Sequence, residues 1–500
     1  MTTTSYRPVD GDVAGTVEDS STAEVSAIVA RAVAAAPHVA ATSPAQRREW
    51  LDRIAEAVEA RAEELVALAD TETGLGETRL RGELGRVAAQ LRFYGAVACE
   101  GSYLGVTRDT ATQTAPALVR VNQPLGPVAV FGASNFPFAF GVLGNDTASA
   151  LAAGCPVVVK AHPAHVLLSL RLVEIAVAAL DEAGAPSGSL GVVVGMAAGA
   201  QLVATEPVAA VGFTGSQGGG LALWRMANER ETVIPVYAEM GTVNPVAMTP
   251  AAAASPGRIE EVAAGFVGSF TLGSGQFCTK PGLLLAPAGH RIAEAVASAL
   301  VAAAPAPVML TSAIAEHATT GVAALTAAGA TVVGRAPART AGWSTDAVVL
   351  RAPADALTPG SPVLAECFGP VAVVVEYDDT THLHQLLGRL SGSLAGTVVT
   401  DTTGADPDAA ALVALLAAQV GRVTIDDWPT GVAWTWAQHH GGPWPATSRP
   451  ESTSVGAAAL ERWVRPVTYQ STPEAWLPPA GRAANPWGVP QRLDGSLAAR

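Results

Sequence analysis

One cysteine lies in a setting suited to nucleophilic chemistry. Cys278 follows glycines and polar residues in the segment GSGQFCTK and precedes Lys280, one of only two lysines in the chain, the other being Lys160. A nearby cation and backbone N–H groups stabilise a thiolate, the nucleophilic form of cysteine. Cys155 and Cys99 lie among apolar residues, as structural cysteines do. Cys278 is therefore the candidate nucleophile, against the alternative of a small core side chain.

Two polar residues directly follow apolar, strand-like runs. Asn135 lies in the segment GASNFP, and Glu239 ends the segment IPVYAE. An amide N–H can stabilise an oxyanion that develops on a reacting carbonyl. A carboxylate at the end of an apolar strand is partly desolvated, which suits a general base. Each residue has a plainer alternative, a turn asparagine and an ordinary loop carboxylate.

A glycine-containing turn offers a phosphate site. The segment from Gly212 to Ser216, GFTGS, follows an apolar run and precedes a helical segment. Gly212 and Gly215 allow a phosphate to approach the backbone N–H groups at the start of that helix, although the spacing is not the full dinucleotide fingerprint. Lys160 ends the run VVVK and could reach a ribose hydroxyl or a phosphate, or could be a solvated strand-end lysine.

The histidines do not predict a metal site. His382 and His384 alternate at an expected helix start, and His439 and His440 are typical of a loop lining. Neither pair has the surroundings of a metal centre. We therefore expect a site without a metal.

The elements that would position these residues form two alternating α/β series. Short apolar runs separated by alanine- and leucine-rich helical segments predict parallel sheets covered on both faces. Ligands of such sheets bind beyond the carboxyl ends of the strands. The expected strands are 128–131, 157–160, 192–195, 209–213 and 234–237 in the first series, and 283–285, 332–334, 371–376, 397–400 and 422–425 in the second.

Both ends of the chain carry further expected elements. Ser43, Pro44 and Gln46 have the pattern of a helix start, and helical spacing continues from there to Gly74. The first forty residues show little periodic pattern. Further elements are expected as helices at 80–98 and near 455–463, and as strands at 115–124 and 464–470.

Composition narrows the possible functions. The chain has 500 residues, 49% of them apolar, so more than one compact unit is expected. The formal net charge of −14 disfavours nucleic acid and anionic membrane surfaces as partners. Four cysteines give no disulfide framework, and the first residues have no signal pattern. Residues 126–145 are uncharged but contain four glycines and two prolines, which disfavours a membrane span. We expect a cytoplasmic protein that acts on small molecules.

Together, the motifs resemble those of the NAD(P)-dependent aldehyde dehydrogenases, in that family's order, over residues 40–470. The matching segments are Asn135-Phe-Pro, Val-Val-Lys160, Gly212-Phe-Thr-Gly-Ser216, Glu239-Met-Gly-Thr-Val-Asn-Pro, Gly-Gln-Phe-Cys278 and Glu366-Cys-Phe-Gly-Pro. Within the family, the segments KAHPAH, HGGPWPATS and RWVRPVTYQ are most similar to α-ketoglutarate semialdehyde (2,5-dioxovalerate) dehydrogenases. The NADP-dependent fatty aldehyde dehydrogenases share part of this pattern.

The resemblance implies a role for each matching residue. Cys278 would be the nucleophile, Asn135 and the Cys278 backbone N–H would form the oxyanion hole, and Glu239 would activate water to hydrolyse a thioester. The implied cofactor contacts are Lys160 to the adenosine ribose, Ser216 in its turn with Gly212 and Gly215 to the pyrophosphate, Glu366 to the nicotinamide ribose, and Phe368 beside the ring.

One departure from the family pattern bears on the cofactor. Pro163 stands where many NAD-preferring members have a glutamate. Loss of an acid that would repel a 2′-phosphate favours NADP or dual use. Lys160, with His162 nearby, could attract that phosphate. We therefore expect NADP or NAD as cofactor, with NADP preferred.

The resemblance also implies the architecture. We expect an α/β fold with a Rossmann-type cofactor domain formed by residues 1–114 and 125–240, and an α/β catalytic domain at 241–430. Strands at 115–124 and 464–470 would form a small oligomerisation sheet. Exposed edge strands invite pairing between subunits, so a homodimer or homotetramer is expected.

The expected substrate is a short aldehyde that carries a carboxylate, with α-ketoglutarate semialdehyde the leading candidate. Phe136, Phe140 and Phe277 would line an apolar tunnel, which suits a fatty aldehyde equally well. A buried carboxylate needs a cation, and Arg449 and Arg92 are the candidates, each with the alternative of a surface arginine. Two further alternatives are an acylating enzyme that releases its thioester to coenzyme A and a non-catalytic binding protein.

Overall fold

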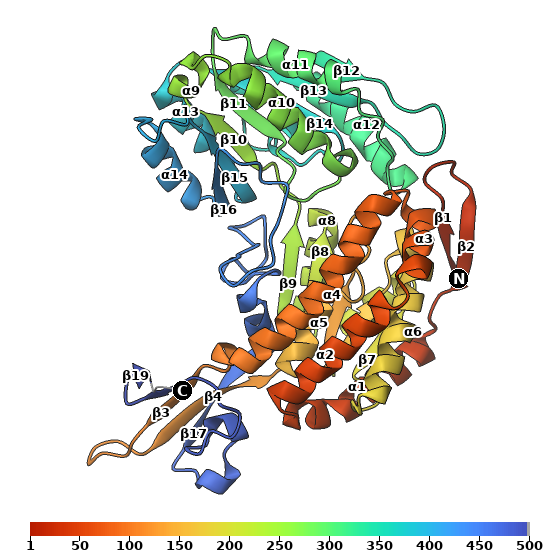
Figure 1. Ribbon diagram of the computed structural model, residues 1–500, viewed down its shortest axis with the longest axis vertical. Coiled ribbons are helices and arrows are strands. Elements are labelled where there is room, and N and C mark those ends of the chain that lie inside the picture. Colours follow the sequence, from red (N-terminus) through yellow and green to blue (C-terminus); the bar gives the residue numbers. More distant parts are fainter. Residues whose placement is uncertain (498–500) are drawn as a thin grey trace.

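The computed structural model describes residues 1–497, which form four β-sheets with helices packed around them (Figure 1). Figure 1 shows the three larger sheets arranged along the molecule, with a seven-stranded sheet at one end and a five-stranded sheet in the middle. The third, also five-stranded, projects at the opposite end. The α/β fold class expected from the sequence is confirmed.

The middle sheet has five parallel strands in the order β7-β6-β5-β8-β9. Its strands are β5 (Val128–Phe131), β6 (Val157–Lys160), β7 (Leu190–Val193), β8 (Ala210–Gly215) and β9 (Val236–Met240), and the helices between them are α5 (Asn145–Ala153), α6 (Val166–Glu182), α7 (Met196–Ala204) and α8 (Gln217–Asn228). Every expected strand of the first series is present, although β7 begins two residues early, at Leu190.

The N-terminal region forms a hairpin and four helices. Strand β1 (Thr2–Tyr6) pairs antiparallel with β2 (Val13–Glu18), and the helices are α1 (Thr22–Ala41), α2 (Pro44–Glu59), α3 (Ala62–Thr73) and α4 (Glu77–Glu100). The sequence analysis assigns no element to the first forty residues and one continuous helix up to Gly74, and both expectations are wrong. A capping box of Ser21 and Glu24 starts α1, by the same mechanism that starts α2.

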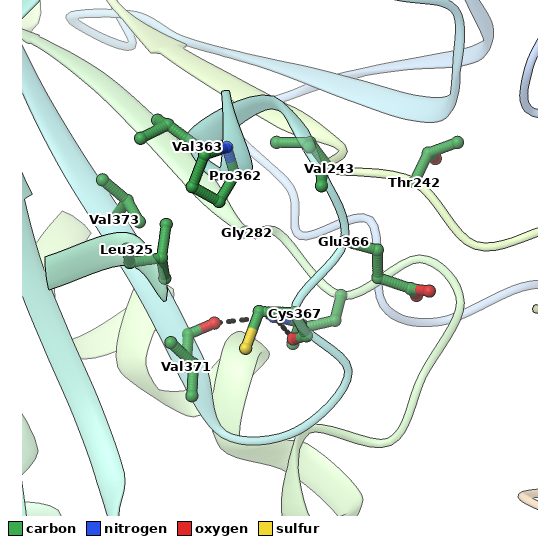
Figure 2. A pocket seen from close by; sticks show the side chains of 12 residues that line it. Thr242, Val243, Gly282, Leu325, Pro362, Val363, Glu366, Cys367, Val371 and Val373 are labelled. Carbon is green, nitrogen blue, oxygen red and sulfur yellow. Dashed lines mark hydrogen bonds between the residues drawn. The ribbon is translucent and has the colours of Figure 1, made fainter. Parts of the chain in front are cut away.

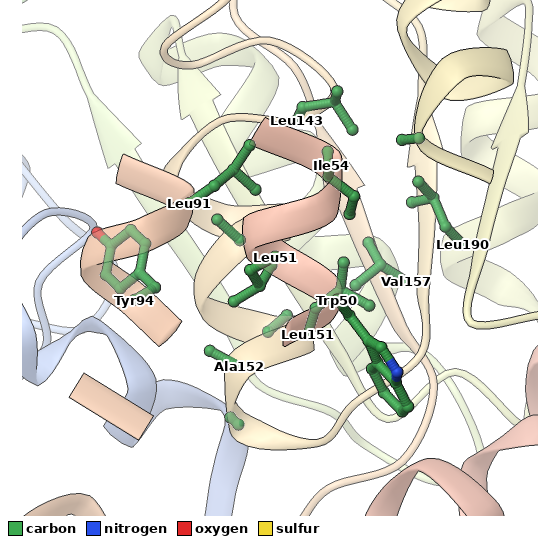
Figure 3. Close-up of a cluster of buried hydrophobic side chains, with 14 of the residues drawn as sticks. Trp50, Leu51, Ile54, Leu91, Tyr94, Leu143, Leu151, Ala152, Val157 and Leu190 are labelled. Carbon is green, nitrogen blue, oxygen red and sulfur yellow. The ribbon is translucent and has the colours of Figure 1, made fainter. Parts of the chain in front are cut away.

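Alternate side chains of the middle strands enter two different cores. Val157 and Val159 of β6 pack with residues of α2, α4, α5 and α6, whereas Val158 packs with residues of α1, α7 and α8. This alternation follows from the two-residue period of a strand, and it explains why the strands are apolar throughout. Figure 3 shows Val157 in the first core, close to Leu51 and Ile54 of α2.

The seven-stranded sheet has the order β12-β13-β14-β11-β10-β15-β16, parallel except for β12. Its strands are β10 (Pro245–Met248), β11 (Leu283–Pro287), β12 (Thr331–Ala336), β13 (Ala347–Ala352), β14 (Val371–Tyr377), β15 (Ser393–Val399) and β16 (Val420–Ile425), and its helices are α9 (Pro250–Ala254), α10 (Arg258–Thr271), α11 (Ile292–Ala303), α12 (Ser312–Ala327), α13 (Thr380–Leu387) and α14 (Ala409–Ala417). The sequence analysis finds five of these strands and lacks β10 and β13.

The projecting sheet joins segments from distant parts of the chain. Strand β17 (Val464–Gln470) pairs antiparallel with β4 (Leu118–Pro124) along its whole length. The sheet continues through β3 (Val106–Asp109), β18 (Gln491–Leu493) and β19 (Ser496–Leu497). Strand β3 therefore belongs here and not with the cofactor unit, to which the sequence analysis assigns residues 1–114. Its four residues, VTRD, contain no apolar run of the kind that marks the other strands.

Short 3₁₀ helices complete the fold. They are η1 (Ser102–Leu104), η2 (Pro163–His165), η3 (Leu272–Gly275), η4 (Ala354–Ala356), η5 (Pro362–Leu364), η6 (Ala457–Trp463), η7 (Glu474–Trp476) and η8 (Pro479–Gly481). The helix expected near 455–463 corresponds to η6.

Two helical segments have the length and hydropathy of a membrane span, namely α1 and Pro163–Glu182. The second is 61% buried inside the protein, and α1 buries Val25, Val29 and Val39 completely or nearly so. The α1 window as a whole is 28% buried, and core helices of globular proteins pass the same length and hydropathy test.

Candidate active site

Four loops and strand ends meet between the middle sheet and the seven-stranded sheet. Asn135 follows β5, Glu239 lies in β9, and Cys278 lies between η3 and β11. The fourth contribution is the segment 438–456, which runs beside β9. Met240 N donates to Ala446 O at 2.8 Å, and Ser448 N donates to Ala238 O at 3.0 Å. This pairing brings residues from both ends of the segment to the Glu239 carboxylate.

Cys278, His440 and Glu239 form a compact cluster. Cys278 Sγ lies 3.6 Å from His440 Nε2, and His440 Nε2 lies 3.0 Å from Glu239 Oε1. The Ser454 hydroxyl donates a short hydrogen bond to Glu239 Oε2, and His440 N donates to Thr453 Oγ1 at 2.7 Å. Both the imidazole and the carboxylate are almost fully buried. The arrangement places a base beside the thiol and a carboxylate beside the base.

The surroundings of Cys278 favour the thiol over the thiolate. Burial raises the pKa of Cys278 well above its usual value, and the carboxylates of Glu239 and Glu366 raise it further. The backbone N–H groups of Cys278 and Thr279 act in the opposite direction. Forming the thiolate therefore requires a proton acceptor, and His440 is in place to be one.

Lys280 does not reach the nucleophile, contrary to the sequence analysis. Its ammonium donates to Cys367 O at 3.0 Å and to Val371 O at 2.6 Å. Burial lowers the pKa of Lys280, while Cys367 and Glu366 raise it. Through these hydrogen bonds, Lys280 links the segment that follows Cys278 to the segment that carries Glu366.

Asn135 is fixed next to the loop that carries the nucleophile. Its side-chain Nδ2 donates to Gln276 O at 2.8 Å, and its backbone O accepts from Arg79 Nη2 at 2.7 Å. A primary amide has two N–H groups, so one remains for a reacting oxygen. Asn244 Nδ2 holds the other side of the loop by donating to Cys278 O at 2.7 Å. Asn135 and Asn244 thus hold the loop that carries Cys278 from two sides, and the oxyanion hole of Asn135 and the Cys278 N–H stays a prediction.

A polar stripe on α4 supports the loop that carries Asn135. The stripe consists of Arg79, Glu83, Arg86, Gln90 and Tyr94, which share one face because they are spaced by three or four residues. Glu83 Oε1 accepts from Phe138 N at 2.9 Å and from Ala139 N at 3.1 Å, and Tyr94 Oη donates to Asn145 Oδ1 at 2.9 Å. The sequence analysis sees only the apolar spacing of this helix.

The three predicted phenylalanines line one cavity together with Cys278 and His440. Phe136 packs edge-on against Phe277 with ring centroids 4.9 Å apart, and its ring centroid lies 5.5 Å from that of Phe140. The residues that line this cavity are Arg86, Phe136, Phe140, Phe277, Cys278, Thr279, Thr430, Gly431, Val432 and His440.

Neither arginine that the sequence analysis nominates lines this cavity. Arg92 makes two hydrogen bonds to the Glu59 carboxylate at 2.6 and 2.7 Å on the surface of α4. Arg449 is exposed, 3.7 Å from Glu451. The structure therefore contradicts both assignments. The phase of α4 and the direction of the loop at Arg449 point these side chains to solvent, and motif spacing reveals neither.

The expected cofactor residues lie at the carboxyl ends of β6 and β8. Gly212 and Gly215 belong to β8, and Ser216 caps α8 by accepting from Gly219 N at 3.2 Å. Burial lowers the pKa of Lys160 to about 8, and Asp19 opposes this. Backbone N–H groups at the start of α8 and the Lys160 ammonium are suited to an anionic ligand.

His162 does not add positive charge to this region. Its Nδ1 accepts from Ala164 N at 3.1 Å, and burial, His165 and Lys160 lower its pKa well below the usual histidine value. These surroundings favour the neutral imidazole, so Lys160 is the stronger candidate for attracting a 2′-phosphate, and the part expected of His162 stays a prediction.

Asp19 lies beside Lys160 and was missed in the sequence analysis. A Cβ added at Gly195 would lie 2.6 Å from Asp19 Cγ, so the carboxylate group rests on the glycine backbone at the start of α7. Ser20 N donates to Val194 O at 2.9 Å, which fixes this segment next to the end of β7. The N-terminal hairpin thus brings an acid to the edge of the sheet where the ribose of a dinucleotide is expected.

The Glu366 carboxylate lies against the backbone of Gly241. Figure 2 shows its carboxylate directed away from the apolar side chains of Val363 and Val373. A Cβ added at Gly241 would lie 2.1 Å from Glu366 Oε2, so only glycine permits this approach. Burial raises the pKa of Glu366 to about 7, against the effect of Lys280. Phe368 is half-buried two residues further along.

The donor set of this region fits a dinucleotide. No hydrogen bond within residues 1–497 reaches the Glu366 carboxylate, which could accept from ribose hydroxyls. Ser216 and the start of α8 offer N–H groups for a pyrophosphate. Together, the fold and the residues gathered at this site are those of an NAD(P)-dependent oxidoreductase.

Comparison with known proteins gives the family. Residues 1–443 match the model of the aldehyde dehydrogenase family, and the chain belongs to that family. It is 42% identical to α-ketoglutaric semialdehyde dehydrogenase 2 of Azospirillum brasilense over 90% of this chain and 87% of the relative. It is 39% identical to the α-ketoglutaric semialdehyde dehydrogenase of Acinetobacter baylyi over 91% and 88%. The protein is an aldehyde dehydrogenase.

Solved structures agree on the fold. Betaine aldehyde dehydrogenase from Staphylococcus aureus, determined with NAD⁺, superimposes with a TM-score of 0.81 at 19% identity and covers 95% of this chain and 96% of its own. A 3,6-anhydro-L-galactose dehydrogenase superimposes with a TM-score of 0.80 at 21% identity and covers 94% and 96%.

Proposed function

We propose that this aldehyde dehydrogenase oxidises α-ketoglutarate semialdehyde to 2-oxoglutarate. Two relatives of about 40% identity over most of the chain carry that activity in their names. The observation that carries the proposed mechanism is the cluster of Cys278, His440 and Glu239, in which His440 Nε2 contacts both the thiol and the carboxylate and all three groups lie within 4.8 Å of one another.

Acylation begins at Cys278. His440 Nε2 accepts the thiol proton, and the resulting thiolate attacks the aldehyde carbon. Asn135 and the Cys278 backbone N–H stabilise the oxygen that becomes negative. The nicotinamide cofactor, when bound, supplies the acceptor for the hydride that leaves this carbon. Collapse of the oxyanion leaves a thioester on Cys278.

Deacylation uses Glu239. Its carboxylate lies in the same cluster, held by the Ser454 hydroxyl on one oxygen and near His440 on the other. It accepts a proton from water, and the hydroxide equivalent attacks the thioester. The acid is released, and the Cys278 thiol regains its proton. A buried base dedicated to water favours hydrolysis over transfer to coenzyme A.

Cofactor binding is assigned to Lys160, Ser216 with its glycine turn, and Glu366, with NADP preferred over NAD. Pro163 removes the acid expected to reject a 2′-phosphate, and Lys160 supplies a positive charge. Asp19 acts in the opposite direction because its carboxylate lies close to Lys160. The preference for NADP should therefore be modest.

The protein is proposed to act in the cytoplasm as a homodimer or homotetramer. The projecting sheet has β17 at one edge and β19 at the other, and β17 presents seven residues for pairing.

An aldehyde panel tests the proposed substrate. Initial rates of cofactor reduction would be compared for α-ketoglutarate and succinic semialdehydes, butanal, hexanal and decanal. We expect the highest kcat/KM for the acidic aldehydes. If decanal exceeded them by about tenfold, a difference of about 1.4 kcal/mol, the fatty aldehyde alternative would replace this proposal. The phenylalanine-lined cavity is the observation that favours that alternative.

A further inference from the structure

We propose that Arg86 binds the carboxylate of the substrate, an inference that rests on the proposed specificity for acidic aldehydes. Arg86 lies on the polar stripe of α4 and lines the cavity that holds Cys278 and His440. Within residues 1–497 it is the one lysine or arginine among the residues that line this cavity.

Aromatic rings hold the guanidinium in the cavity wall. Arg86 Cζ lies 4.9 Å from the ring centroid of Trp434, 5.7 Å from that of Phe140 and 5.9 Å from that of Phe136. Stacking on ring faces orients a guanidinium without using its N–H groups. Phe136 and Phe140 also form the walls of the cavity, so a ligand between these rings meets the guanidinium edge.

The guanidinium has an unused donor. Arg86 Nη2 is buried and has no hydrogen-bond partner within residues 1–497. Arg86 Nε is only 3.2 Å from the amide oxygen of Gln90 when that amide is oriented to accept. A buried N–H group without a partner is costly, and a carboxylate on a bound substrate would satisfy it.

The local charge balance also favours an anion. Glu83 is the acid of the polar stripe, and it lies near both Arg79 and Arg86. One carboxylate between two guanidinium groups leaves one positive charge in excess. Burial lowers the pKa of Arg86, while Glu83, Tyr94 and Cys278 raise it. A substrate carboxylate would neutralise the excess charge in a site closed to most solvent.

The other arginines near the site each donate to a backbone carbonyl, although Arg79 Nη1 and Arg422 Nε are also buried without a partner within residues 1–497. Arg79 donates to Asn135 O at 2.7 Å, and Arg422 donates to Gly431 O at 2.6 Å and to Pro429 O. Neither is among the residues that line the cavity. These two side chains hold loops in place, which leaves Arg86 for recognition.

The test removes the charge and keeps the length of the side chain. We expect Arg86→Met to lower kcat/KM for succinic and α-ketoglutarate semialdehydes by about 10- to 100-fold, the effect of one lost charged hydrogen-bonded pair. The value for butanal should change by less than about threefold. Arg86→Lys should recover part of the acidic activity, because an ammonium keeps the charge but cannot grip a carboxylate with two parallel hydrogen bonds.

Arg92→Met is the matched control. Arg92 lies on the same helix, paired with Glu59 at the surface, so its loss should leave the ratio of acidic to neutral activity unchanged. Thermal melting and cofactor binding of each variant would be recorded. Glutarate, added as an inhibitor of butanal oxidation, gives a second readout, because its inhibition constant should rise in Arg86→Met and not in Arg92→Met.

The outcomes separate the two proposals. If the wild-type enzyme prefers decanal, the proposed substrate is wrong and the assignment of Arg86 fails with it. If the wild type prefers acidic aldehydes but Arg86→Met lowers acidic and neutral activity equally, the substrate proposal stands and the Arg86 assignment is overturned. Should Arg86→Met not fold, the ratio for Arg86→Lys and its glutarate inhibition decide the question, and unchanged values would overturn the assignment.

Discussion

Glu239 Oε1 lies 3.0 Å from His440 Nε2, and the same imidazole nitrogen lies 3.6 Å from Cys278 Sγ. One nitrogen thus faces both the nucleophile and the carboxylate assigned to activate water. Nε2 accepts the thiol proton through its lone pair, and once protonated it can donate that N–H to the Glu239 carboxylate, so the two contacts are used in turn. Glu239 stays ionised in this arrangement and remains able to accept a proton from water.

The first prediction concerns His440. His440→Gln should lower kcat by about 10²- to 10⁴-fold at neutral pH, the usual contribution of a positioned base. Because burial and two carboxylates raise the pKa of the Cys278 thiol, the variant should regain activity as the pH rises. The pH profile of kcat and the rate of alkylation by iodoacetamide measure this effect.

His439→Gln is the neighbouring control for that experiment. His439 is half-buried and has no hydrogen bond to Cys278 or Glu239 within the described residues. Its substitution should leave the alkylation rate and the pH profile close to those of the wild type. Rapid alkylation of His440→Gln at neutral pH would contradict the assignment of His440 as the base.

The second prediction separates the two half-reactions. Glu239→Gln should keep a first burst of reduced cofactor, equal to about one turnover per site, and lose the later steady-state rate. Acylation needs Cys278, Asn135 and His440, whereas deacylation needs the carboxylate. Stopped-flow absorbance at the reduced-cofactor band records both phases. A missing burst would show that Glu239 already acts before hydride transfer.

The sequence predicts those parts of the site that local motifs define. Cys278, Asn135 and Glu239 each follow an apolar run or a glycine-rich segment, so their loops are recognisable one at a time. His440 was considered only as a loop lining, because its partner Cys278 is 162 residues away. The pairing of segment 438–456 with β9 brings His440 and Cys278 together. The spacing of residues along the chain does not predict this pairing.

Side-chain direction explains most of the other errors. Lys280 is close to Cys278 in sequence, yet its ammonium binds Cys367 O and Val371 O. Arg92 and Arg86 lie on one helix, six residues apart, but on different faces. The helical periodicity that located α4 could have separated them, because Arg79, Glu83, Arg86 and Gln90 form a buried to half-buried polar stripe. Strands β3 and β10 have only four residues each, whereas β13 has six and its apolar run AVVL is as clear as those of the strands that were predicted.

The third prediction concerns the pH dependence of cofactor binding. The pKa of Glu366 is raised to about 7, so the free enzyme holds this carboxyl half-protonated near neutrality. Ribose hydroxyls donate to the ionised form, so the Kd for NAD should fall as the pH rises from about 5.5 to 7.5, by up to about tenfold per pH unit below the pKa. Isothermal titration calorimetry measures the Kd. NAD is the ligand of choice because it lacks the 2′-phosphate of NADP, whose own protonation would add to the pH dependence.

Two features sharpen that measurement. Lys160 has a pKa of about 8, so it remains charged over most of this window. Glu366→Gln should bind NAD with little pH dependence. The same pKa shift affects the stability of the folded protein. Because folding raises the pKa of Glu366, the contribution of this group to the free energy of unfolding is greatest at acidic pH and is lost as the pH rises toward 7. A Kd for NAD that is constant across this range in the wild type would show that Glu366 does not contact the ribose in its ionised form.

The last prediction concerns Asp19 and the choice of cofactor. The N-terminal hairpin places this carboxylate against Gly195, near Lys160, in the region where the adenosine ribose is expected. A carboxylate repels a 2′-phosphate and can accept hydrogen bonds from a free ribose diol, so it should favour NAD over NADP. Asp19→Asn should therefore raise the ratio of kcat/KM for NADP to that for NAD by about three- to tenfold, the effect of one charge near solvent.

Asp12→Asn is the matched control for Asp19→Asn. Asp12 is exposed in the same hairpin and pairs with Arg7, so its substitution should leave this ratio unchanged. Steady-state kinetics at low and high salt would check the cause, because an effect of charge shrinks as salt screens it. A ratio that does not move in Asp19→Asn would mean that Pro163 and Lys160 alone determine the preference.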